Sequence, residues 1–247
     1  MEQQAISKVC LLAGKIMLES GAETYRVEDT MVRIAQAFGM DNAQSHATPS
    51  AITFAIDMTE QVHFVRIDER VTDLYKVSRV NSISRHISEN KLTVADAREE
   101  LLKVDDQKYL FSQLMRIFAA AFASGCFTIM FQGSWYDFLP AFVVGGLGYS
   151  TLQYFNQLLK IRFFAEFLAS FLLAFSAFVL IEINIGVAFD SIIIGSIMPL
   201  VPGLLITNAV RDMMAGHLVS GITKAVEAIL TALAIGAGVA IVILIFY

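Results

Sequence analysis

Five long apolar segments fill the second part of the chain and limit what it can fold into. They cover residues 114–131, 138–155, 163–181, 185–206 and 226–246. Each is close to the ~20 residues that a helix needs to cross the hydrocarbon of a bilayer. A soluble domain that buried five such helices would have too little polar surface to cover them. The pattern therefore predicts five transmembrane helices.

Charged residues divide the chain in the same way. Residues 1–110 contain 13 Lys or Arg and 17 Asp or Glu, whereas residues 111–247 contain 5 and 6. An apolar content of 56% excludes an intrinsically disordered chain. We predict a small cytoplasmic α/β domain at residues 1–108, followed by a membrane α-helical domain at residues 109–247. A net charge of −5 without a basic face argues against a nucleic-acid partner.

The apolar spacing within the first hundred residues changes twice. Helical spacing predicts one helix that ends at Gly21 and a second that ends at Gly39. Alternation over residues 52–56 and a second β-like run at 63–67 predict a hairpin. Helical spacing then returns, and Thr93 followed by Asp96 predicts the N-cap of a last helix.

Basic residues predict how the spans are oriented. They precede the first span, lie between the second and third, and lie between the fourth and fifth: Lys108, Arg116, Lys160, Arg162, Arg211 and Lys224. The other two connections contain none, so all basic flanks fall on one side. We expect a multi-pass protein of the cell (inner) membrane, surrounded by lipid, with a cytoplasmic N-terminus and an external C-terminus.

The fourth span contains the most informative stretch. Pro199 and Pro202 remove two backbone donors, and Gly203 loosens the chain further, so the helix is predicted to break there. A broken span beside polar groups is how many transporters build a binding site. The half-helix after Gly203 would present backbone N–H groups to an anion such as a carboxylate. The candidate translocation residues near the break are Ser196, Thr207, Asn208 and Asp212. A simple proline kink is the alternative.

Acidic side chains within a span are costly, so they are candidates for a proton or substrate relay. Asp190 lies in the external half of the fourth span, and Glu166 lies near the internal end of the third. Glu166 and Asp212 lie close to the interface, where a solvated role is an equal alternative. No Cys or His cluster has metal-ligand spacing, and no nucleotide-binding signature occurs. We therefore expect no metal, no cofactor and no ATP-driven pumping.

Two stretches resemble the signatures of the threonine/serine exporter family. The first runs from Gly21 to Asp29 in the cytoplasmic domain and includes Glu23, Arg26 and Glu28; without the resemblance it would be interpreted as a capped turn or a docking site. The second is Pro199-Leu-Val-Pro202-Gly203 with Asn208, Asp212 and Gly216-His217. Family members carry ten spans in one chain. Five spans resemble the YjjP-type half, which works with a separate small YjjB-type membrane subunit.

The resemblance implies export of a small polar metabolite, either threonine and serine or, for split members, succinate. We consider three functions: an exporter subunit driven by an ion gradient, a membrane-anchored hydrolase, and a scaffold or sensor. The break in span four favours the exporter, because an anchor needs no such break. No nucleophile elbow supports a hydrolase, so we expect no catalytic residues. Glycines in spans two and five predict close contact with partner helices, within this chain or in another: Gly145, Gly146, Gly148, Gly236 and Gly238. We also expect a hetero- and homo-oligomer.

Overall fold

The chain forms two compact units in a computed structural model that describes residues 2–107, 111–159 and 161–246. The first unit combines Met1–Tyr109 with Leu204–Val226, and the second combines Leu110–Gly203 with Glu227–Tyr247. The segment 204–226 packs with the N-terminal region, although the predicted domain boundary assigns it to the membrane domain. The division into a cytoplasmic domain 1–108 and a membrane domain 109–247 stays a prediction, because compactness does not report where a bilayer lies.

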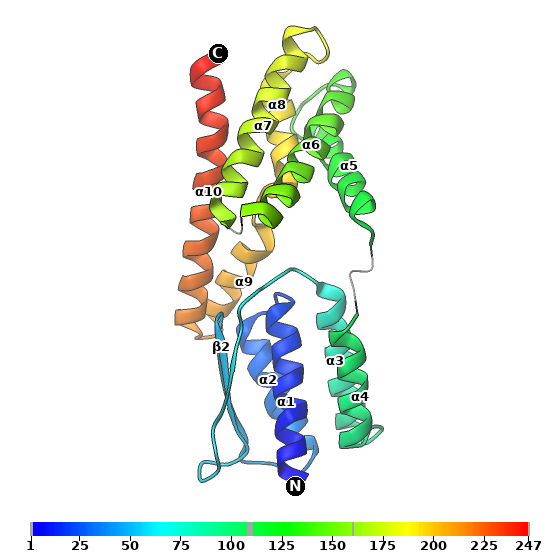
Figure 1. The fold of residues 1–247 in the computed structure, drawn as a ribbon, viewed down its shortest axis with the longest axis vertical. Coiled ribbons are helices and arrows are strands. Elements are labelled where there is room, and N and C mark those ends of the chain that lie inside the picture. The colour runs from blue at the N-terminus through cyan, green and yellow to red at the C-terminus, as the bar shows by residue number, and fades with distance from the viewer. Residues whose placement is uncertain (1, 108–110, 160, 247) are drawn as a thin grey trace. The chain divides into compact units, whose positions relative to one another are not determined.

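Helices and a small sheet build the N-terminal region of the first unit (Figure 1). The helices are α1 (Glu2–Glu19), α2 (Thr24–Ala37), α3 (Leu74–Ser88) and α4 (Val94–Asp105). The strands β1 (Gln44–Thr48), β2 (Ala51–Ala55) and β3 (His63–Arg66) form an antiparallel sheet in the order β1-β2-β3. The predicted hairpin is therefore confirmed as β2–β3, while β1 had no sequence signal. Apolar side chains of the helices and of β2 form one core.

Local signals in this region act as the sequence predicts. Gly21 and Gly39 have φ values of +81° and +80°. This left-handed conformation ends α1 and α2, because glycine adopts it at little steric cost. Thr93 and Asp96 form a capping box at the start of α4. Ile52 and Phe54 alternate into the core, since successive strand residues point to opposite faces.

Close helix contacts characterise the second unit, whose helices are α5 (Gln113–Met130), α6 (Trp135–Leu159), α7 (Arg162–Glu182) and α8 (Phe189–Ile197), with the later part of α10 (Leu218–Phe246). A Cβ added to Gly145 of α6 would collide with Ser124 of α5, and one added to Gly195 of α8 would collide with Thr128 of α5. Gly238 of α10 likewise lies against Ser170 of α7. The expectation of close helix contacts is confirmed at Gly145 and Gly238, within the chain itself, whereas a Cβ added to Gly236 would meet nothing within 4 Å.

Candidate membrane helices are fewer than the five that we predicted. Among the described residues, Gln113–Met130, Phe163–Glu182 and Leu218–Phe246 are long and apolar enough to span a bilayer. A fourth span results if Phe189–Leu200 and Gly203–Met214 count as one bent pair. The helix α6 occupies the position of the predicted second span, but its glycines and polar residues lower its hydropathy. The protein is thus a helical membrane protein, and the count of five spans stays a prediction.

The predicted break in the fourth span is present. Helix α8 ends at Ile197, a 3-10 turn covers Met198–Leu200, and Val201 is extended, with φ −62° and ψ 131°. Helix α9 (Gly203–Met214) begins directly after Pro202. Proline removes a backbone donor and blocks a continuous helix, so the two prolines account for the interruption.

The segment after the break differs from the sequence-based expectation. Arg211 and Lys224, which we predicted in a connection between spans, lie in α9 and α10. Helix α10 begins at Leu218, before the predicted span start at 226. Gly216 has a φ of +88°, which permits a tight turn between the two helices.

Candidate functional site: a buried charge cluster at the α1–α2 turn

Helices α9 and α10 meet the turn between α1 and α2 within the first unit. This turn contains the first family-like stretch, Gly21–Glu28, and α9 contains part of the second. Asn208, Arg211 and Asp212 share one face of α9, because residues three and four apart are neighbours on a helix. The structure thus brings together groups that are 188 residues apart in the sequence.

Asp212 is the centre of the cluster and is 0% exposed. Its Oδ1 accepts hydrogen bonds from the backbone N–H groups of Thr24, at 2.8 Å, and Tyr25, at 3.4 Å. Its Oδ2 accepts from the Thr24 hydroxyl at 2.9 Å and from the Lys224 ammonium at 2.7 Å. Four donors therefore satisfy both oxygens of a carboxylate that no water reaches.

Lys224 supplies the opposite charge. Its side chain is 4% exposed, and Nζ lies 2.7 Å from Asp212 Oδ2. The same ammonium donates to Thr24 Oγ1 at 3.0 Å and to the carbonyl of Ala22 at 3.4 Å. Removing one partner of a buried ion pair costs about 3–5 kcal/mol, because the other charge is left without compensation. Asp212, Lys224 and Thr24 therefore depend on one another.

Glu23 forms a second ion-pair group beside the first. Its Oε1 accepts from Arg211 Nη1 at 2.6 Å, and its Oε2 accepts from Arg26 Nη1 at 3.1 Å. Burial works to raise the pKa of the Glu23 carboxyl, but hydrogen bonds from its own backbone and from the two arginines outweigh burial and lower the pKa below its usual value. Asn208 Nδ2 donates to the carbonyl of Gly21 at 2.8 Å, which fixes the turn itself to α9.

Glu28 joins the cluster to the α9–α10 turn. Its Oε1 accepts from the backbone N–H of Ala47 at 2.7 Å. The Nδ1 atoms of His46 and His217 lie 3.5 Å and 3.6 Å from the same oxygen. Across the described ranges, no group of three Cys, His, Asp or Glu is arranged to hold a metal ion. We therefore interpret this group as a hydrogen-bonded junction of α2, β1 and the helical turn.

The predicted site residues fall into two sets. Six of them belong to the buried cluster: Gly21, Glu23, Arg26, Glu28, Asn208 and Asp212. Thr207 of α9 is exposed. Ser196, Pro199, Pro202, Gly203 and Asp190 belong to the second unit. Ser196 is buried there and donates to the carbonyl of Ala141 at 3.2 Å, while Asp190 is exposed in the first turn of α8.

Sequence reasoning missed Thr24, and it used Lys224 and Arg211 only as topology signals. A lysine next to a long apolar run is a signal that could have indicated a buried ion pair, since an unpaired cation is costly there. Lys108 and Lys160, which also supported the orientation, lie outside the described residues. Because Lys224 is paired and buried, it cannot serve as a free basic flank.

A second buried carboxylate, Asp137, has a structural task in the second unit. It accepts hydrogen bonds from the backbone and hydroxyl of Ser134, at 2.9 and 2.6 Å, and from the backbone N–H groups of Val187 and Ala188, at 2.6 and 3.1 Å. The carboxylate thereby joins the α5–α6 connection to the segment before α8. No cation is among these donors, which distinguishes Asp137 from Asp212.

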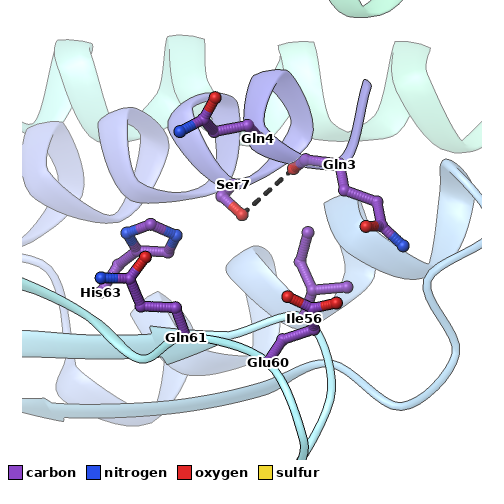
Figure 2. Close-up of a pocket in the computed structure, with 7 residues that line it drawn as sticks. All are labelled: Gln3, Gln4, Ser7, Ile56, Glu60, Gln61 and His63. Atoms are coloured by element: carbon purple, nitrogen blue, oxygen red, sulfur yellow. Dashed lines mark hydrogen bonds between the residues drawn. The ribbon is translucent and has the colours of Figure 1, made fainter. Parts of the chain in front are cut away.

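A polar cavity of about 240 Å³ lies elsewhere on the first unit, between the start of α1 and the β2–β3 connection. Figure 2 shows its lining, with the hydroxyl of Ser7 donating to the carbonyl of Gln3 at 3.1 Å. Several of the side chains around it, such as Gln4, Glu60 and Gln61, are exposed. It contains none of the predicted site residues, and we assign it no role.

Comparison with known proteins agrees with the two family-like stretches. Residues 8–246 match the family model ThrE, described as "Putative threonine/serine exporter". The chain is 26% identical over 245 residues to the "Probable succinate transporter subunit YjjP" of Klebsiella aerogenes, covering 93% of this chain and 90% of that protein. The corresponding protein of Escherichia coli is 25% identical over 252 residues, covering 96% and 93%.

Longer fungal proteins also match. The "Pheromone-regulated membrane protein 10" of Kluyveromyces lactis is 26% identical over 246 residues, which cover 96% of this chain but 25% of that protein. No solved structure matches the chain at a significant level.

Proposed function

Because the chain belongs to the ThrE family of membrane exporters, we propose that it exports a small carboxylate-bearing metabolite from the cytoplasm, driven by an ion gradient. The substrate is threonine or serine, or a C4 dicarboxylate such as succinate. The relatives named as succinate transporter subunits support the dicarboxylate, and the family description supports the amino acids. The chain is one subunit and works with a second small membrane subunit of the YjjB type, in a hetero- and homo-oligomer.

The buried cluster around Asp212 is the observation that carries this proposal. Burying ionisable groups in the helices of a membrane protein is costly, so such groups are candidates for an ion or substrate pathway. Asp212 and Lys224 lie in α9 and α10, both of which belong to candidate spans. A scaffold or sensor that uses its spans only for anchoring does not require such an ion pair in them.

The membrane-anchored hydrolase receives less support. Cys10 is buried, and desolvation raises the pKa of its thiol to about 12, so its thiolate is not available as a nucleophile. The acidic groups Glu23 and Asp212 are occupied by arginine, lysine and backbone donors. These contacts occupy the positions from which either carboxylate would have to take a proton from a bound substrate, as a general base must.

The break before α9 supports a binding site for the substrate carboxylate at the start of that helix. The first N–H groups of a helix have no carbonyl partner within that helix, and they favour anions. Leu204 and Ile206 in this first turn are exposed, and Thr207 follows them. Asn208, which we expected to meet the substrate, donates instead to Gly21 in this structure. We propose that Thr207 and the first turn of α9 receive the carboxylate.

Efflux from cells or membrane vesicles tests the proposed function. Vesicles that contain this chain and its partner subunit should export labelled threonine or succinate, and those with this chain alone should not. Pro202→Ala should lower efflux by restoring a continuous helix, whereas Lys91→Ala on the surface should have no effect. Full efflux from this chain alone would contradict the subunit assignment, and absence of efflux with the partner would contradict the function.

The proposed orientation has a separate test. Reporter tags at the two ends should lie in opposite compartments, the N-terminal tag in the cytoplasm and the C-terminal tag outside the inner membrane. Two tags on the same side would contradict the five-span topology.

A further inference from the structure

We infer that Asp212 is the proton-exchange site of the transport cycle, and that Lys224 and Thr24 are the groups with which the proton competes. This inference rests on the proposed exporter function, and it specifies the ion and the residue that binds it. It follows from the burial of the ion pair, from the way its hydrogen bonds are distributed, and from the segments that those bonds join.

The Asp212–Lys224 pair is more dehydrated than twelve other ion pairs of the first unit. Its two side chains are 0% and 4% exposed. In each of the others, at least one side chain is 23% exposed or more. Solvent cannot replace a lost partner in such a place, so separating the two charges requires that one of them be neutralised. A proton on Asp212 is the smallest change that achieves this.

Protonation of Asp212 and its present contacts exclude each other. Both oxygens accept hydrogen bonds here, and Oδ2 accepts from two donors, the Thr24 hydroxyl and the Lys224 ammonium. A proton on Oδ2 converts this acceptor into a donor that faces the Lys224 ammonium, which can only donate, while the Thr24 hydroxyl must turn to accept. The protonated carboxyl must therefore release Lys224 and reverse its bond with Thr24, and the closed pair must release the proton. Exclusive binding of this kind couples a proton to a conformational change.

These bonds join the segments that would have to move. The Thr24 backbone and hydroxyl belong to the start of α2, Asp212 belongs to α9, and Lys224 belongs to α10. Loss of the Oδ2 contacts therefore loosens the α1–α2 turn from both helices at once. The bond from Asn208 to Gly21 and the partly exposed Glu23–Arg211 ion pair still join the turn to α9.

Other titratable groups of the cluster do not share these properties. Glu23 lies between Arg26 and Arg211, whose side chains are 35% and 56% exposed, so water can screen changes in its charge. Glu28 is approached by His217 and His46, which are 23% and 70% exposed. Among these acids, Asp212 alone has a buried cation as its partner.

Transport assays with imposed gradients test the inference. Membrane vesicles that hold this chain with its partner subunit receive labelled threonine or labelled succinate as the probe, in separate experiments. Two quantities are measured: accumulation of the probe against its gradient after a pH jump, and exchange of labelled for unlabelled probe at equal pH on both sides. The wild-type complex should show both, and accumulation should require the pH gradient.

Asp212→Asn should abolish coupling while leaving exchange at the wild-type rate. We expect accumulation to fall by about tenfold, within the range of coupling between linked sites. Because this variant leaves Lys224 buried without a counter-charge, the double variant Asp212→Asn/Lys224→Met provides a neutral pair and should behave in the same way. The matched control is Glu99→Gln/Lys103→Met, which removes an ion pair whose side chains are 69% and 61% exposed. Its coupling should be unchanged.

Several outcomes would overturn the inference. One is normal pH-driven accumulation in the double variant. Another is an assembled variant that loses exchange together with accumulation. A third is a double variant that fails to assemble, because the ion pair would then have a structural role. Accumulation that follows a Na⁺ gradient and ignores pH would also overturn it. A wild-type complex that exchanges neither probe would instead refute the proposed function, and this result is distinguishable from all the others.

Discussion

The two compact units bury polar side chains in different ways. In the second unit, the hydroxyls of Ser124 and Thr128 donate to carbonyls four residues earlier in their own helix, Ala120 at 2.9 Å and Ser124 at 3.0 Å. In the first unit, Asp212, Lys224 and Thr24 bond across helices that are far apart in sequence. Bonds between distant segments also occur in the second unit, at Asp137 and Ser196, but no cation takes part in them. The long-range bonds of the first unit differ because they include a buried ion pair, whose contacts change when one charge is neutralised.

Of the variants considered, Lys224→Met should lower the free energy of unfolding most. The variant leaves the Asp212 carboxylate buried without a cation, which we expect to cost about 3–5 kcal/mol of unfolding free energy. The double variant Asp212→Asn/Lys224→Met should recover most of this loss, since neither charge remains. Thermal unfolding of the purified protein measures both. Equal stability of Lys224→Met and wild type would show that water reaches Asp212, contrary to its 0% exposure.

Thr24→Val tests the hydroxyl that lies between the two charges. It keeps the shape of the side chain but removes the donor to Asp212 and the acceptor for Lys224. Hydrogen bonds to charged groups contribute about 1.5–3 kcal/mol, so a loss of this size is expected. Thr24→Ser, which keeps the hydroxyl, is the matched control. If the two variants are equally stable, the hydroxyl has no part in holding the pair.

Acid should weaken the first unit through Glu23. The pKa of this carboxyl is lowered in the folded protein, so its stabilisation is present above the unfolded value of about 4.5 and is lost as the pH falls through the lower folded value. Arg211→Gln should cost about 1 kcal/mol, because Arg211 is 56% exposed and its ion pair is screened. Unfolding measured below pH 4.5 should show a shallower loss of stability in this variant. An unchanged acid profile would contradict the role of Arg211.

Much of this fold follows from local patterns in the sequence. Apolar spacing predicts α1 and α2, glycines mark their ends, alternation predicts β2, and Thr93 predicts the start of α4. Strand β1 was missed because Gln44–Thr48 is polar and mostly accessible, without an apolar alternation. The sequence places Arg211 and Lys224 in a connection between spans, and not in α9 and α10, because these two charges interrupt the hydropathy that a span requires.

Only part of the candidate site could be predicted from the sequence, and the reason is physical. Family-like stretches identified Glu23 and Asp212, but nothing local shows that residues 188 positions apart bind each other. Lys224 gives no signal of its own, since a lysine beside a span is usually a solvated flank. Its role depends on the partner that tertiary packing provides, and an apolar pattern does not encode that partner.

Ser124→Ala should give the smallest effect and completes the comparison with Thr24. Both side chains are 0% exposed, and both lose a hydroxyl. The Ser124 hydroxyl donates to the Ala120 carbonyl, which as part of a helix also accepts from the backbone, so its loss leaves no buried charge unsatisfied. Alanine is also the better helix former, by a few tenths of a kcal/mol. We therefore expect a change of less than about 1 kcal/mol and normal efflux. Thermal unfolding and vesicle efflux should be measured for this variant and for Thr24→Val. If Ser124→Ala lowers the unfolding free energy as much as Thr24→Val does, the hydroxyls of α5 also hold separate helices together. The contrast between the two units would then be wrong.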